Sequence, residues 1–470
     1  MKFKILLTSW LLCLVILLAS CSGFDTGVDK NVSSLAETSS VAESSPASSA
    51  EVSSDISSIA PSSKAASKAA SSKTASKAPA QKVNPVEIEN IKIPDLASSD
   101  AFSPLPEYVH NTKYSYIKES DYYGYSTLNT NRKKYYTAIR DTIKNMGEGC
   151  ILPGASETDT HIAYFAVMCD YPQYFWMGHQ YLYGRNESDM IVLFSYKDDD
   201  YDVDYICTRA EAISRIKAMN SEITRIFNAM PSGLSEFDRQ KYLHDYLANK
   251  NSYDERAVSS WKSYLDAFNA YGALIKGRIV CEGYSRGWQL LLREAGIQAS
   301  VVAGTGAEEA HMWNVMKIEG SWYYSDLTWN DGNPNPYEYF NIPRYILEFD
   351  HTLSTTNAAS NPENFNLVLP ECNSVAQNYL FVNGFGFDKS NYDNYEALLF
   401  AKIQEAALAG KREIRFIVSN DIDETLYINV IAYIGSRLNY SALNAPLGSK
   451  YIGTVNMGIY EREYYYRFNW

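Results

Sequence analysis

The sequence predicts an α+β protein in which helices pack on an antiparallel sheet, with a further α/β unit on each side. Three observations support this fold class. Apolar residues recur at helical spacing over residues 209–230 and again over 237–247. Two runs of apolar and aromatic residues flank Glu319-Gly320, the pattern of a tight β-hairpin. From residue 361 onward, strand-like and helix-like segments alternate.

Length and charge limit the class of protein. A chain of 470 residues allows about three domains. Hydrophobic residues make up 46% and aromatic residues 14%, which is typical of a globular chain. The formal net charge is -13, from 42 Lys and Arg against 55 Asp and Glu. This balance provides no overall basic field for a polyanion, so we expect no nucleic-acid partner.

The first twenty residues predict a bacterial lipoprotein leader. Two lysines precede an uncharged run from Ile5 to Ser20, which is shorter than the roughly 20 residues that span a bilayer as a helix. The run ends in Leu18-Ala19-Ser20-Cys21, which resembles a lipobox, and the Cys21 thiol is the group that accepts the lipid. We therefore expect an extracytoplasmic protein that Cys21 anchors to the cell membrane.

A tether follows the anchor. Over residues 31–80 the chain has 18 Ser and 12 Ala and no aromatic residue, so it cannot build a core. Lysines from Lys64 to Lys82 suit either a solvated tether or contact with anionic wall polymers. The expected divisions are a leader (1–20), a disordered linker (21–98), an N-terminal α/β unit (99–232), a catalytic core (233–355) and a C-terminal α/β unit (356–470).

Helix and strand signals mark the units around the core. In the N-terminal unit we expect a helix over 131–146, a buried strand over 190–196 and a helix that Thr208 caps. A second capped helix runs from Ser235 to Asn251, and its His244 is interpreted as a packed or solvated residue. The tail predicts a helix over 395–409 and strands over 413–418, 451–455 and 463–468, without a catalytic constellation.

Cys281 lies at the start of a predicted helix. Residues 277–284 lead into Trp288 and Leu291 at helical spacing, and Gly296 is placed to end the helix. The N–H groups and the dipole of a helix start stabilise a thiolate and lower a thiol pKa from about 8.5 to roughly 3.5–7.5. A buried structural cysteine is more typical of the middle of an apolar face. The position therefore favours a reactive thiol.

A β-hairpin carries the next two candidate residues. A two-residue loop at 319–320 makes Ile318 the partner of Ser321. Counting outward from this pair, His311 and Asp326 fall on one face as diagonal cross-strand neighbours within reach of a hydrogen bond. A thiol at a helix start with a histidine and an aspartate on adjacent strands is the arrangement that nucleophilic acyl transfer requires.

At these residues the chain resembles the transglutaminase-like superfamily, whose thiol enzymes share a core fold with papain-like cysteine proteases. The resemblance implies that Cys281 is the nucleophile, His311 the general base and acid, and Asp326 the orienting residue. One oxyanion donor would be the Cys281 N–H, while the second is open and Tyr271 is a guess. No calcium-binding loop is evident, so no metal and no cofactor are implied. The matched segments are 280–284, 311–314 and 326–331, with likeness upstream at 253–254, 271–274 and 170–176.

Two functions remain open. The first is a lipid-anchored enzyme that acts on peptide or protein amide bonds in the envelope, more by hydrolysis than by crosslinking. The second is a catalytically silent binding or scaffolding module on the same fold. His351 lies past the matched core and is interpreted as structural. Four cysteines remain, with three full disulfide pairings or none possible: Cys150, Cys169, Cys207 and Cys372.

Overall fold

The structure is a computed structural model that describes most of the chain beyond residue 103. Cys21, the linker except residues 86–87, and all of the expected leader except residues 2–7 lie outside the described residues, so the anchor stays a prediction. Within the described part, no helix is both long and apolar enough to cross a membrane. The described residues are 2–7, 86–87 and 104–469, with gaps at 179, 187, 198–200, 359–364, 412, 420, 423–428, 430–432, 434–436, 448–453 and 461–462, and only the backbone is described for 2–7, 86–87 and 454–469.

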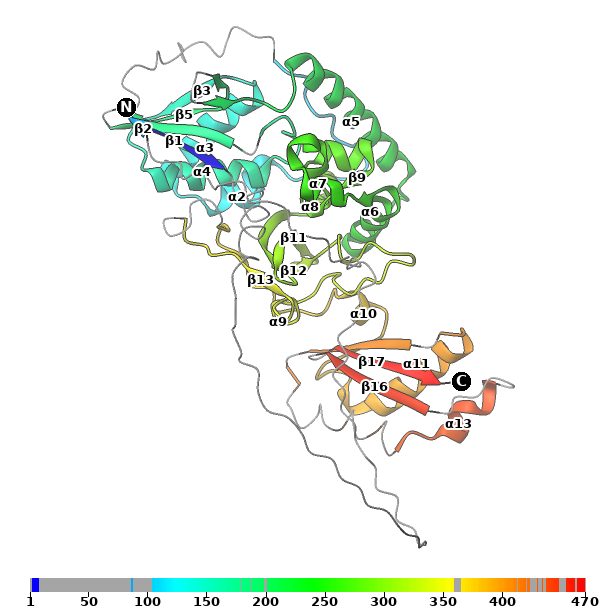
Figure 1. The fold of residues 1–470 in the computed structure, drawn as a ribbon. Helices are drawn as coiled ribbons and strands as arrows, with labels where there is room; N and C mark the ends of the chain where they lie inside the picture. Colours follow the sequence, from blue (N-terminus) through cyan, green and yellow to red (C-terminus); the bar gives the residue numbers. More distant parts are fainter. Residues whose placement is uncertain are drawn as a thin grey trace, which may run out of the picture.

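An antiparallel sheet in the order β2-β1-β4-β5-β3 forms the N-terminal unit, where α3 packs along α4 (Figure 1). A polar side chain caps the N-terminus of each of these helices: Asn129 accepts a hydrogen bond from the Arg132 N–H, and Ser156 accepts one from the Asp159 N–H. β1 falls inside the expected leader, whose removal would leave β4 as an edge strand. The elements are β1 (Lys2–Leu7), β2 (Val86–Glu87), α2 (Tyr123–Thr127), α3 (Thr130–Lys144), β3 (Gly149–Leu152), α4 (Glu157–Asp170), β4 (Gln180–Asn186) and β5 (Asp189–Leu193).

Two long helices lead to the core. Thr208 and Glu211 form the predicted capping box at the start of α5 (Arg209–Ala229). The Ser235 hydroxyl accepts a hydrogen bond from the Asp238 N–H at the start of α6 (Glu236–Lys250). His244 on α6 is fully buried among aromatic rings, as a packed residue. Short elements follow: β8 (Ser252–Tyr253), α7 (Glu255–Ser259), η3 (Trp261–Ser263), η4 (Leu265–Phe268), η5 (Gly272–Lys276) and β9 (Arg278–Ile279).

The core consists of α8 (Cys281–Glu294) against an antiparallel sheet in the order β12-β11-β10-β13. Because the N-terminal unit covers the other side of α8, this helix is buried on nearly its whole circumference. A single apolar cluster extends from Leu105 to Leu367, so packing is continuous across residue 232, where the sequence suggested a boundary. The strands are β10 (Ala299–Gly306), β11 (Glu309–Ile318), β12 (Ser321–Ser325) and β13 (His351–Leu353).

The C-terminal unit has its own sheet and its own apolar cluster, which lie on the far side of the core from the N-terminal sheet (Figure 1). It contacts the core through an ion pair of 2.6 Å between Arg415 and Glu338, and through Ile417, which packs in a cluster with core residues. The fold is thus the α+β class that the sequence predicts. The tail elements are β14 (Gly386–Phe387), α11 (Tyr395–Leu408), β15 (Glu413–Val418), α13 (Tyr440–Asn444), β16 (Thr454–Tyr460) and β17 (Glu463–Asn469).

Candidate active site

Cys281 is the first residue of α8, as the sequence predicts, and it is half-buried. Gly277, with φ of 79°, turns the chain from η5 into β9 and toward this helix. The Val280 N–H then donates to the Ala267 carbonyl at 3.0 Å. At Gly283 a Cβ atom would lie 2.4 Å from that same carbonyl, so only glycine lets the first turn of α8 approach so closely. As the first residue of the helix, Cys281 has an N–H without an acceptor inside it.

The hairpin has the predicted register. Ile318 pairs with Ser321, and both loop residues, Glu319 and Gly320, have positive φ, as a type I′ turn requires. His311 and Asp326 therefore share a face, and His311 Nε2 lies 2.6 Å from Asp326 Oδ2. The His311 side chain is 8% exposed and that of Asp326 is fully buried.

Cys281 also interacts electrostatically with His311 and raises its pKa, which links the three predicted residues. Burial by itself lowers the pKa of His311, but the Asp326 carboxylate and the interaction with Cys281 together outweigh it and raise that pKa to about 10. Since Nε2 faces Asp326, Nδ1 is the nitrogen left for the thiol. An imidazolium between a carboxylate and a sulfur stabilises the thiolate, which is the nucleophilic form.

Each carboxylate oxygen of Asp326 has two hydrogen-bond partners. One oxygen, Oδ2, contacts His311 and, at 3.3 Å, His351 Nε2. The other, Oδ1, accepts from the N–H groups of Thr328 at 2.9 Å and Trp329 at 3.3 Å. Burial tends to raise the pKa of Asp326, but the two histidines more than reverse this and hold it well below its usual value. The carboxylate is therefore fixed in its ionised form.

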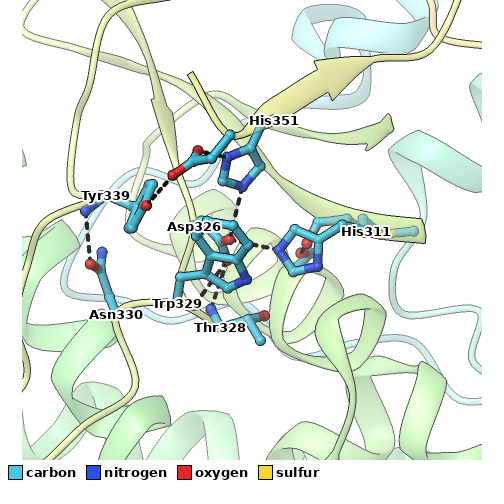
Figure 2. A network of polar contacts seen from close by, with 10 residues as sticks. His311, Asp326, Thr328, Trp329, Asn330, Tyr339 and His351 are labelled. Atoms are coloured by element: carbon cyan, nitrogen blue, oxygen red, sulfur yellow. Dashed lines mark hydrogen bonds and ion pairs between the residues drawn. The ribbon is translucent and has the colours of Figure 1, made fainter. Parts of the chain in front are cut away.

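His351, which the sequence analysis interpreted as structural, lies at the site and contacts Asp326. Figure 2 shows Asp326 between the His351 and His311 rings, with Trp329 beside them. The other ring nitrogen of His351 lies 2.6 Å from Asp350 Oδ1, so both nitrogens face carboxylates. Burial lowers the pKa of His351, but hydrogen bonds to Asp326 and Asp350 outweigh this and raise it. No motif near residue 351 signals this role, because β13 reaches the site only by pairing with β10.

His311, Asp326 and His351 also have the spacing of a metal site, with donor atoms within 4.8 Å of one another. The same atoms are already joined by hydrogen bonds, and the second nitrogen of each histidine has its own partner. A metal ion could enter only by replacing both histidine contacts to Asp326. A hydrogen-bonded His-Asp-His chain therefore describes the arrangement better than a set of metal ligands does.

Tyr253 is the upstream side chain in electrostatic reach of the thiol. β8 pairs in parallel with β9 so that Tyr253 is opposite Ile279, two residues before Cys281. Desolvation, and next the charge of Cys281, raise the pKa of the Tyr253 hydroxyl. Tyr271, by contrast, has its ring 5.3 Å from Phe175 and 4.8 Å from the Arg215 guanidinium. These contacts make Tyr253 a better candidate than Tyr271 for a second oxyanion donor.

The polar side of α8 fixes the helix against the N-terminal unit. Arg286 pairs with Glu282 at 2.7 Å and donates to the Met168 carbonyl at 2.7 Å. One turn later Gln289 donates to the Cys169 carbonyl at 2.5 Å. Because these groups are buried, loss of either partner would leave a polar group unpaired at a cost of about 1–3 kcal/mol. The segment 170–176, with its likeness to family lead-ins, adjoins this contact.

The remaining cysteines differ from Cys281. All five cysteines in the described part of the chain are free, so of the pairings that the sequence left open the structure has none. Burial raises the pKa of Cys150 and Cys372 to about 12 and that of Cys207 to about 11, and it also raises that of Cys169. None of these four belongs to the His-Asp-His chain.

Comparison with known proteins confirms the predicted resemblance. Residues 227–327 match the model of the transglutaminase-like superfamily, and this segment contains Cys281, His311 and Asp326. This segment of the chain is therefore similar to the transglutaminase-like superfamily. No curated protein matches the chain.

Three solved structures are similar to parts of the chain. A transglutaminase structure has 19% identity and a TM-score of 0.23, over 31% of this chain and 43% of its own. A candidate cysteine protease from Cytophaga hutchinsonii has 17% identity and a TM-score of 0.20, over 24% and 37%. A candidate protease from Parabacteroides distasonis has 12% identity and a TM-score of 0.18, over 31% and 35%. The chain thus spans less than half of each of these structures.

Proposed function

We propose that this protein is a thiol enzyme that cleaves amide bonds in peptides or proteins through Cys281, His311 and Asp326. The observation that carries the proposal is the 2.6 Å contact between His311 and the buried Asp326 carboxylate, together with the electrostatic interaction of His311 with Cys281 at the start of α8. The transglutaminase-like segment at 227–327 supports a thiol-enzyme fold. Hydrolysis is favoured over crosslinking, as in the expectation from the sequence.

The chemistry follows from the protonation states. The Cys281 thiolate attacks the amide carbonyl carbon, and the resulting oxyanion is stabilised by the Cys281 N–H and the Tyr253 hydroxyl. The C–N bond then breaks as the His311 imidazolium gives its proton to the departing amine. In the second step water adds to the thioester, His311 accepts a proton from it, and the carboxylic acid leaves with the thiol restored. Asp326 orients His311 throughout.

The proposal places this activity at the cell envelope. The leader ending at Cys21 supports a lipid anchor, and about 75 tether residues form a coil of roughly 50 Å that extends to at most about 250 Å. The substrate would therefore be a peptide or protein outside the cytoplasm. Membrane fractionation and metabolic lipid labelling of the wild type and of Cys21→Ala test the anchor, and equal labelling of both would contradict it.

A peptide-library digest with and without a primary amine, analysed by mass spectrometry, tests the reaction. We expect hydrolysed peptides that depend on Cys281, with Cys281→Ala as the inactive control. Amine adducts in place of hydrolysis would instead indicate acyl transfer to amines. If the wild type and Cys281→Ala give identical spectra, and no ammonia is released from glutamine-containing proteins, the catalytically silent binding module is the better description.

A further inference from the structure

A pocket of about 400 Å³ is lined by residues of α5, α7, η3, η4 and β9. Five cationic side chains line it against two carboxylates, which leaves an excess of three positive charges. The whole chain has a net charge of -13, so this pocket reverses the prevailing sign. The cations are Arg215, Arg256, Lys262, Lys276 and Arg278, and the carboxylates are Asp254 and Asp266.

Internal ion pairs neutralise only part of this charge. Arg215 pairs with Asp266 at 2.8 Å, and Arg256 pairs with Asp254 at 2.7 Å. Arg278 lies 3.6 Å from Asp254 Oδ2, but Arg256 already donates to both oxygens of that carboxylate, and the Arg278 side chain is 58% exposed.

Two lysines at the pocket have no carboxylate partner. Lys262 and Lys276 are exposed and form no ion pair within the described part of the chain. Lys262 lies 5.5 Å from the Trp261 ring centroid, and Lys276 lies 5.5 Å from that of Tyr271. These contacts hold cationic groups at the pocket without neutralising them, so they are available to an anion from outside the protein.

The pocket wall is continuous with the element that begins at the thiol. Ala267, which lines the pocket, accepts the Val280 N–H and contacts the first turn of α8 at Gly283. Arg278 precedes Cys281 by three residues. At about 3.3 Å per extended residue, this spacing puts the Arg278 backbone within roughly 10 Å of the Cys281 backbone. A peptide bound at Cys281 and extending toward Arg278 would reach the pocket with a residue about three positions from the cleaved amide.

We propose that this pocket binds an acidic segment of the peptide substrate and gives the enzyme a preference for Asp or Glu near the cleaved amide. This inference rests on the proposed function and deepens it. The guanidinium group of Arg278 suits a carboxylate because it can donate two parallel hydrogen bonds. An acidic peptide is favoured over a phosphate polymer because Arg278 lies three residues before Cys281, so that a peptide held at the thiol would lie within reach of the pocket.

Cleavage rates on matched peptides test the preference. Each acidic residue of a peptide found in the library digest is replaced in turn by its amide, Glu by Gln or Asp by Asn. We expect a five- to tenfold fall in kcat/KM at one position about three residues from the cleaved bond, the size of one or two half-exposed charge contacts.

The double variant Lys262→Glu/Lys276→Glu is expected to abolish the ratio of kcat/KM between the acidic peptide and its amide counterpart. The control Lys389→Glu/Lys411→Glu, which changes the net charge equally on the exposed C-terminal unit, is expected to keep it. An unchanged ratio in the first variant would overturn the proposal.

Binding to the full-length Cys281→Ala variant tests the pocket without catalysis. Fluorescence anisotropy compares a fluorescein-labelled (Gly-Glu)₃ peptide with its Gln counterpart, and inorganic tripolyphosphate serves as competitor. We expect the Glu peptide to bind more tightly, with weaker binding at high salt and in Lys262→Glu/Lys276→Glu. Equal binding of both peptides, or binding of tripolyphosphate alone, would overturn the inference. Selective Glu-peptide binding without Cys281-dependent cleavage would support the pocket and overturn only the proposed function.

Discussion

His311 and His351 occupy the two sides of one carboxylate oxygen, yet their surroundings differ. His311 lies 2.6 Å from Asp326 on its accessible side, and its other nitrogen is the one left for the thiol. His351 lies 3.3 Å from Asp326 on the closed side, fully buried, and its other nitrogen faces Asp350. Two histidines on one carboxylate thus differ in their expected roles: His311 would transfer protons to and from the thiol side, whereas His351 holds the carboxylate in place. The group that the second ring nitrogen faces makes the difference.

The largest effect is expected when His311, the histidine that faces the thiol, is removed. His311→Ala leaves neither a base nor an acid, so amide cleavage is expected to fall at least about 10⁴-fold. Modification of Cys281 by iodoacetamide at neutral pH is also expected to slow, because the thiolate loses its imidazolium partner. His161→Ala, which removes a buried histidine in the N-terminal unit, is the control for folding. Labelling of Cys281 that is indifferent to His311→Ala would contradict the activated thiolate.

The second-largest effect is expected when Asp326 loses its charge but keeps its shape, because this charge sets the pKa of His311. His311 must be protonated to act as an acid, so wild-type activity is expected to persist below its pKa of about 10 and to fall as pH rises through it. Asp326→Asn removes the main group that raises this pKa. The alkaline limb is then expected to move toward the usual value of about 6.5, with a loss of about 10³-fold in kcat/KM. A pH-rate profile with its alkaline limb unmoved would show that Asp326 does not set the proton affinity of His311.

Tyr253 tests the stabilisation of the oxyanion, in contrast to the proton transfer that His311 would perform. If its hydroxyl donates to the oxyanion, Tyr253→Phe lowers kcat about 10²-fold and leaves the alkaline limb in place, because it does not contact His311 in this role. Tyr271→Phe is the matched control and is expected to retain most of the activity. The reverse ranking of these two variants would transfer the donor role to Tyr271.

The smallest effect is expected when His351, the histidine on the closed side of Asp326, is replaced. His351→Gln keeps a donor for Asp326 but removes a positive charge, so a fall of about tenfold in kcat/KM is expected, the size of one charge-assisted hydrogen bond. Because the His351 and His311 charges repel each other, the alkaline limb is expected to stay or rise, opposite to Asp326→Asn. Circular dichroism melting checks the fold of the variant. An alkaline limb that moves to lower pH would show that His351 acts by orienting Asp326 and not through its charge.

Local rules account for the parts of the site that the sequence predicted. The two-residue loop at 319–320 allows one register, and with it the meeting of His311 and Asp326. The glycines around Cys281 and the apolar spacing after it mark the start of α8. In both cases the determining residues lie close in sequence to those that they position.

Distant pairing accounts for what the sequence could not predict. His351 reaches Asp326 because β13 adds to the edge of β10, and no periodicity around residue 351 encodes that choice. The cationic pocket likewise combines Arg215 on α5 with Lys276 and Arg278, some sixty residues later. Neither feature has a local signal.

By itself, the sequence predicted that Cys281 starts a helix and that His311 and Asp326 meet, because helix starts and hairpin registers follow from short stretches of chain. Only the tertiary structure decided what surrounds them. It left the four other described thiols unpaired, since burial and not disulfide bonding holds them. It made α8 the shared wall of two units, and it brought a second imidazole and a set of cations to that helix. These depend on which surfaces pack together, and that is settled by the burial of the whole core.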